Sequence, residues 1–356
     1  MRKVLKRGED IRNFLLKEVF NNPENLKAAE LKQIASKKFN IQPASVACHL
    51  RQLVNAGQVL DKNGFLVLKK EELVERTLPL NQKIDEERVY AELVAPQIAN
   101  VSANAEKLIA YAFTEMVNNA KDHSGGTELR LRVWETPFST TVLISDNGIG
   151  IFKKIKQSLN LSDEKQSILE LSKGKFTTDP TNHTGEGVFF ASRMCDSFFI
   201  FSGANFYAHD LANPRDTLSD SDRLGQVPGT HILFQVNNHT SRSIKKVFDK
   251  YATVDDGFTK TEVLVRLVRY KNEGLISRSQ AKRMLNRVDR FQAVVFNFEG
   301  VDLIGQAFAD QVFRVFKNAH PGIQISTIKT NSTIDKMIRH VTRQSDEPTT
   351  DPESQG

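Results

Sequence analysis

Residues 105–124 read AEKLIAYAFTEMVNNAKDHS, and residues 146–150 read DNGIG. In the first stretch the apolar residues recur every three or four positions, which predicts a helix with a broad apolar face. Beside that face lie Glu115, Asn119 and Asp122, whose spacing places them on one polar stripe. A carboxylate in such a stripe can activate water while a carboxamide oxygen holds a metal ion. The helix is therefore predicted to carry part of a reactive site.

The second stretch follows a predicted strand over residues 140–145. Asp146 stands at the end of that strand, and Gly148 and Gly150 come directly after it. Glycines let the backbone approach a flat ligand closely, while the carboxylate accepts a hydrogen bond from an amino group. This stretch is predicted to bind such a ligand.

Two further glycine segments follow along the chain. Gly185 and Gly187 precede a predicted helix, where exposed backbone N–H groups bind phosphate. Gly229 and Thr230 begin a predicted strand. No G-x-x-x-x-G-K-[ST] motif occurs, so the common phosphate-binding loop is excluded.

In this order and at this spacing, the four segments resemble the GHKL ATPase superfamily, which includes gyrase, heat-shock chaperones and histidine kinases. The resemblance covers about residues 100–236. It implies an α/β sandwich that binds ATP with Mg²⁺. Two features depart from the family. Glu186 places a negative charge where phosphate is expected. In addition, no histidine precedes the segment in a phosphoacceptor setting, so an autophosphorylating histidine kinase is not expected.

The resemblance also implies a role for individual residues. Asp146 would accept the adenine amino proton with help from Thr230 through water, Asn119 would bind Mg²⁺, and Glu115 would be the general base. An ATP lid would span residues 152–184. The other residues implied at the nucleotide are Asp122, Gly148, Gly150, Gly185 and Gly187, together with Lys173 and Lys175 beside the phosphates.

The first 78 residues show three short helical patterns followed by two apolar runs around Asn63-Gly64, which predicts a hairpin. This order resembles the winged helix-turn-helix family, in which the third helix enters the major groove of duplex DNA. The implied DNA contacts are Ser45, His49, Arg51, Gln52 and Lys62. A winged helix that contacts only protein is the alternative.

Strand and helix patterns alternate between residues 255 and 343, which predicts an α/β module. The stretches SRSQAKR (277–283) and VDLIGQAFAD (301–310) resemble a STAS-like domain of unknown function. Related anti-sigma antagonists carry a phosphorylated serine at a strand-to-helix turn. No Ser or Thr occurs here between residues 294 and 318, so a phosphorylation relay within the chain is not expected.

The net charge changes sign along the chain, which agrees with a division into several modules. Net charge is +6 over residues 1–80, −5 over 81–240, +9 over 241–343 and −4 over 344–356. We therefore expect a multidomain α+β protein with a winged helix (1–78), a GHKL sandwich (81–240), a STAS-like module (255–343) and a disordered acidic tail (344–356). The two cysteines exclude a disulfide framework, and no apolar stretch is long enough to span a membrane, so a cytoplasmic location is expected.

The predicted function is an ATP-binding, DNA-binding regulator in which the nucleotide state controls the winged helix and the STAS-like module. Weak ATP hydrolysis is expected, and a protein partner or a homodimer is compatible with the pattern. Two alternatives remain open. One is a GHKL protein Ser/Thr kinase that acts on a partner protein. The other is a DNA-repair or defence ATPase whose nucleotide controls dimerisation.

Overall fold

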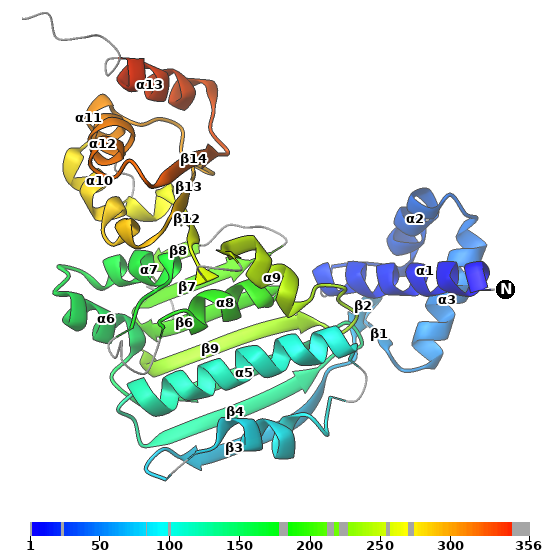
Figure 1. Cartoon of the computed structure of the whole chain (residues 1–356). Coiled ribbons are helices and arrows are strands. Elements are labelled where there is room, and N and C mark those ends of the chain that lie inside the picture. Colours follow the sequence, from blue (N-terminus) through cyan, green and yellow to red (C-terminus); the bar gives the residue numbers. More distant parts are fainter. Residues whose placement is uncertain are drawn as a thin grey trace, which may run out of the picture.

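The computed structural model describes residues 2–22, 25–82, 84–98, 101–177, 184–211, 217–220, 227–253, 257–269 and 274–343. It shows three modules along the chain, with helices and several sheets, which agrees with the predicted multidomain α+β class (Figure 1). The predicted acidic tail lies outside the described residues. In the part of the chain that is described, no helix has both the length and the apolar character needed to cross a membrane.

The N-terminal module contains three helices and a hairpin around one apolar core. Its elements are α1 (Arg2–Asn21), α2 (Ala28–Phe39), α3 (Pro43–Asn55), β1 (Val59–Lys62) and β2 (Phe65–Leu68). Asn63 and Gly64 form the hairpin turn with positive φ angles of 55° and 87°, as the Asn-Gly pair predicts. Phe138, from the turn between two central strands, packs on Phe20 with ring centroids 4.9 Å apart and joins the module to its neighbour.

A seven-stranded antiparallel sheet forms the central module. In spatial order its strands are β3 (Glu71–Pro79), β4 (Glu128–Glu135), β5 (Ser139–Asp146), β9 (Val227–Asn237), β6 (Ser197–Gly203), β7 (Asn205–Asp210) and β8 (Thr217–Asp220). The predicted boundary near residue 78 is therefore wrong. Residues 71–79 pair with β4 along their whole length, so the N-terminal module ends near residue 70.

Helices cover one face of this sheet, where α5 (Ala103–His123) and α8 (Gly187–Met194) lie side by side (Figure 1). In β4 the side chains alternate between buried apolar residues, such as Leu129 and Leu131, and exposed Arg130. The remaining central helices are α4 (Glu86–Val89), which continues as a π-helical turn to Val94, α6 (Ile151–Leu159), α7 (Glu164–Lys173) and α9 (Ile244–Tyr251).

The predicted lid is largely regular structure. Residues 152–184 contain most of α6 and all of α7, whose Phe152, Ile155 and Ile168 are fully buried in the main core. Residues 152–173 are therefore helices packed into the core, in contrast to the open lid expected over residues 152–184. The loop that follows Lys173 is much shorter, and its residues 178–183 lie outside the described residues.

The C-terminal module alternates strand and helix as predicted. A parallel sheet holds β12 (Lys260–Leu264), β13 (Ala293–Asn297) and β14 (Gln324–Ile328) in that order, and β10 (Ala252–Thr253) and β11 (Gly257–Phe258) form a short hairpin before it. Its helices are α10 (Arg278–Leu285), α11 (Gln306–Asp310), α12 (Lys317–Ala319) and α13 (Ser332–Arg343), with a π-helical turn (Gln311–Phe316) joining α11 to α12.

Candidate functional site

A cavity of about 320 Å³ opens in the central module between the sheet and its helices. Residues of α5, α6, α8, β5 and β9 line it, and the loop after α7 closes one side. Its apolar wall consists of Met116, Ile144, Ile151, Ile155, Leu171, Phe176, Val188, Phe189 and Ile232. Predominantly apolar walls with a few polar groups are typical of small-molecule sites.

Asp146 lies in the cavity wall with 8% of its surface exposed. One carboxylate oxygen, Oδ1, accepts hydrogen bonds from the backbone N–H groups of Gly148 (2.8 Å) and Thr230 (3.3 Å). Burial raises the pKa of this carboxyl above its ordinary value, while the two N–H donors act in the opposite direction. The cavity therefore contains a buried carboxylate held in a defined orientation.

The glycines around Asp146 are required by close backbone contacts. At Gly148 an added Cβ would overlap the carbonyl oxygen of Ser124, and at Gly229 it would overlap the carbonyl oxygen of Asp146. Gly229 also has a φ angle of +72°, which L-residues rarely adopt. Gly150 lines the cavity and directly precedes α6, whose first N–H, that of Ile151, donates to Thr230 Oγ1 at 3.0 Å. Gly148 does not line the cavity, so the segments around residues 148 and 229 form a tightly packed corner behind Asp146.

Helix α5 provides the opposite polar wall. Glu115 and Asn119 line the cavity as predicted, and His123 continues the row one turn later. Asp122 does not line it and is exposed, so its predicted place at the nucleotide is wrong. The cavity faces the edge of the polar stripe that carries residues 115, 119 and 123. A polar stripe alone does not show which of its edges faces the core, which is why His123 was missed.

The loop and the first turn of α8 complete the cavity. Gly185 and Gly187 both line it, and α8 begins at Gly187 as predicted. Gly185 has a φ angle of +73°, and its carbonyl accepts a hydrogen bond from the Phe176 N–H at 3.1 Å. Glu186 is half-buried, and burial raises the pKa of its carboxyl despite the nearby Lys175.

The two predicted phosphate lysines do not line the cavity. Lys173 is 1% exposed, and its ammonium donates to Glu170 and to the Asn286 carbonyl in the C-terminal module, at 2.8 Å each. Lys175 donates to the Arg290 carbonyl at 3.0 Å. The expectation that these lysines lie beside a phosphate is therefore wrong for this structure, because the C-terminal module already provides acceptors for both ammonium groups.

Lys154 is a cationic side chain that lines the cavity, and the sequence reasoning missed it. Its ammonium donates to the His123 carbonyl at 2.6 Å, and burial lowers its pKa. It stands on the first turn of α6, four residues after Gly150. A lysine one turn into a helix that follows a glycine pair was the available signal.

The polar groups present fit a nucleotide with a metal ion. Asn119 Nδ2 is buried and has no hydrogen-bond partner in the described part of the chain, which is unusual because buried polar groups are normally bonded. The unpaired atom is an N–H donor, which suits an acceptor atom of a bound ligand such as a phosphate oxygen. A metal ion would instead be held by Asn119 Oδ1, an amide oxygen of the kind that Mg²⁺ prefers.

The predicted DNA contacts divide into two groups. Ser45 and Arg51 on α3 and Lys62 in the hairpin are exposed. His49 is only half exposed and its ring lies beside Gly8 of α1, while Gln52 accepts a hydrogen bond from Arg12 of α1 at 3.4 Å. The structure thus places His49 against α1. Gln52 is exposed like the other three side chains but is bonded to α1 through Arg12.

The comparisons with known proteins concern the C-terminal module. A family model described as "STAS-like domain of unknown function (DUF4325)" matches residues 280–335, from within α10 to the first turn of α13. This match confirms the resemblance predicted for that module. No curated protein shows a significant match to the chain.

Proposed function

We propose that the central module is a GHKL-type site that binds ATP with Mg²⁺ and hydrolyses it slowly. The observation that carries the proposal is the arrangement of polar groups in one apolar cavity. The buried Asp146 carboxylate lies in the sheet wall, and Glu115 and Asn119 lie in the helix wall. ATP has an adenine base and a triphosphate. Asp146 is a hydrogen-bond acceptor suited to the base, and Glu115 and Asn119 are an acid and an amide suited to the phosphate end.

Each side chain then has a task. Asp146 accepts a hydrogen bond from the adenine amino group, and the apolar wall packs on the ring faces. Asn119 holds Mg²⁺, which when bound neutralises phosphate charge. Glu115 takes a proton from the attacking water. The backbone N–H groups at the start of α8 and the ammonium of Lys154 stabilise the phosphate oxygens.

We further propose that the N-terminal module binds duplex DNA as a winged helix, so that the whole chain is a nucleotide-dependent DNA-binding regulator. The support is the exposed pair of Arg51 on α3 and Lys62 in the hairpin, in a module whose residues 1–70 carry a net charge of +8. Exposed basic side chains on a helix and an adjoining hairpin favour phosphate contact.

Titration calorimetry of the full chain with ATP and Mg²⁺ tests the nucleotide site. Asp146→Asn should weaken ATP binding, because a buried polar contact is left unmade, at a cost of about 1–3 kcal/mol. Asp249→Asn, at an exposed acid that pairs with Lys245, is the matched control and should bind as the wild type does. Equal ATP affinity in all three proteins would refute the site. Transfer of the γ-phosphate to another protein would instead favour the kinase alternative.

A further inference from the structure

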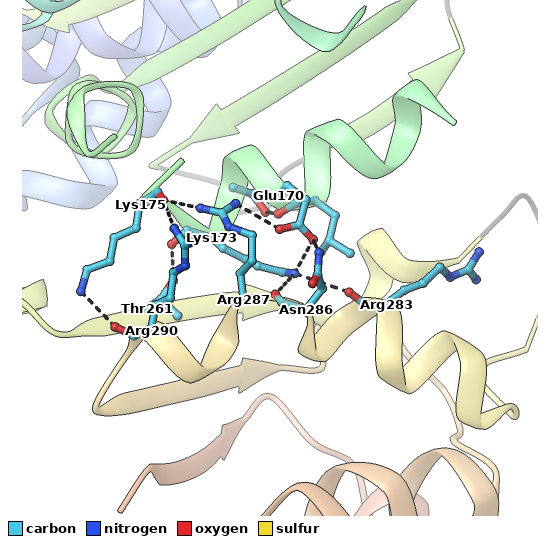
Figure 2. Close-up of polar contacts among 10 residues, drawn as sticks. Glu170, Lys173, Lys175, Thr261, Arg283, Asn286, Arg287 and Arg290 are labelled. Carbon is cyan, nitrogen blue, oxygen red and sulfur yellow. Dashed lines mark hydrogen bonds and ion pairs between the residues drawn. The ribbon is translucent and has the colours of Figure 1, made fainter. Parts of the chain in front are cut away.

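The central and C-terminal modules meet at a buried ionic cluster (Figure 2). The Glu170 carboxylate of α7 binds Lys173 at 2.8 Å, Arg287 at 3.2 Å and the Asn286 side chain at 3.2 Å. The side chains of Glu170 and Lys173 are 3% and 1% exposed, and that of Arg287 is 10% exposed. The end of α7 is therefore fixed to the segment that follows α10.

Arg287 also binds the backbone directly beyond α7. Its guanidinium donates to the Lys175 carbonyl, and Arg290 donates to the same oxygen at 3.3 Å. Gly174 and Lys175 have φ angles of +82° and +53°, so two consecutive residues are left-handed. For lysine this conformation is unfavourable and persists only where its surroundings stabilise it. The two arginines supply that stabilisation.

The next residue reaches the cavity. Phe176 lines it, and the Arg287 guanidinium lies 5.4 Å from the centre of the Phe176 ring. The Phe176 N–H donates to the Gly185 carbonyl, and Thr177 and Thr184 line the same wall. One arginine of the C-terminal module thus contacts the acid of α7, the turn after α7 and the aromatic ring in the cavity wall.

We propose that Arg287 is a positioning residue of the nucleotide site, which holds residues 174–177 in the conformation that places Phe176 in the cavity wall. The C-terminal module is then required to complete the site, although none of the described residues that line the cavity belongs to it. This proposal rests on the proposed ATP binding. The contacts of Arg287 with the loop involve protein atoms alone, so its effect on the loop can be measured without nucleotide.

The test uses the full chain and two readouts. Hydrogen exchange without nucleotide reports the loop, and titration calorimetry with ATP and Mg²⁺ reports the site. Arg287→Ala should speed exchange at residues 174–177 and 184–187 and weaken ATP binding roughly tenfold. Arg290→Ala leaves the Glu170 cluster intact and should also speed loop exchange and weaken ATP binding, but to a smaller extent. This variant keeps the proposal testable if Arg287→Ala fails to fold. Lys282→Ala, at an exposed lysine of the preceding helix α10, is the control.

Arg287→Lys separates positioning from simple stabilisation. A lysine keeps a positive charge beside Glu170, but it lacks the planar group that contacts the carboxylate, the Lys175 carbonyl and the Phe176 ring together. It should restore resistance to urea without restoring ATP affinity. Full recovery of affinity, or unchanged loop exchange in folded Arg287→Ala and Arg290→Ala, would overturn the proposal. If Arg287→Ala speeds exchange of the loop but the wild-type chain binds no ATP, the positioning role of Arg287 is supported and the proposed ATP binding is refuted.

Discussion

The Glu115 carboxylate lies directly against the Cα atom of Gly187, so that a Cβ atom at position 187 would overlap Glu115 Oε2. Glu115 belongs to α5 and Gly187 is the first residue of α8, and both line the cavity. The missing side chain at Gly187 therefore provides the space that the proposed general base occupies. Because residue 187 is glycine, the first turn of α8 can pack against Glu115 without displacing its carboxylate.

Gly187→Ala tests this relationship. The added methyl group should push the Glu115 carboxylate away and reduce ATP turnover by ~10² or more, the usual contribution of a general base. Gly322→Ala is the matched control, since a Cβ atom there meets nothing within 4 Å. Phosphate release measured under saturating ATP checks the prediction. Turnover equal to that of the wild type would contradict the placement of Glu115.

Glu115→Gln separates binding from chemistry. The amide keeps the size of the side chain but cannot take a proton from water, so ATP affinity should stay within about threefold of the wild type while turnover falls by ~10²–10⁴. Calorimetry and phosphate release on the same sample measure the two quantities. Unchanged turnover in this variant would exclude Glu115 as the base.

DNA binding should depend on the exposed residues of the N-terminal module. Lys62→Ala should weaken binding to every duplex and reduce the slope of log affinity against log salt by about 0.9, the value for one phosphate contact. Arg51→Ala should instead reduce the preference between sequences, while Gln52→Ala should have less effect than Arg51→Ala because Gln52 bonds Arg12. Fluorescence anisotropy at several salt concentrations measures both effects.

The full chain is the sample for these measurements, because a fragment of residues 1–80 would expose β3 without its partner strand. Lys336→Ala, at an exposed lysine of the C-terminal module, is the control. If the wild-type chain shows no salt-dependent binding to any duplex, the module contacts protein instead.

The buried cluster predicts an asymmetry in stability. Glu170→Gln leaves the ammonium of Lys173 and the guanidinium of Arg287 buried without a counter-charge, which should cost about 3–5 kcal/mol of unfolding free energy. Lys173→Met should cost less, because Glu170 keeps Arg287 and Asn286 as partners. Burial also lowers the pKa of Lys173, because desolvation disfavours the charged ammonium.

Urea unfolding followed at Trp134, the single tryptophan of the chain, measures this asymmetry in the central module. Glu128→Gln, at an exposed acid of β4, should unfold as the wild type does. A larger loss for Lys173→Met than for Glu170→Gln would show that Glu170 is not the centre of the cluster.

Local patterns in the sequence determined much of the architecture. The apolar period of residues 105–124 predicted α5, Asn63-Gly64 predicted the hairpin turn, and alternating patterns predicted the order of elements in the C-terminal module. The glycines at 150, 185 and 187 were correctly placed at the cavity, whereas Gly148 does not line it. These features were predictable because they depend on backbone conformation and on residues a few positions apart.

Tertiary structure alone decided the rest. Residues 71–79 carry a strand pattern, but only the presence of an open edge on β4 assigns them to the central sheet. Lys173 and Lys175 follow a lysine-glycine pattern expected near phosphate, yet long flexible side chains bind whichever acceptor lies within reach. Besides Glu170, those acceptors are backbone carbonyls more than a hundred positions away. Periodicity specifies which face of an element is apolar, whereas the partner of a polar or charged side chain depends on how distant segments pack.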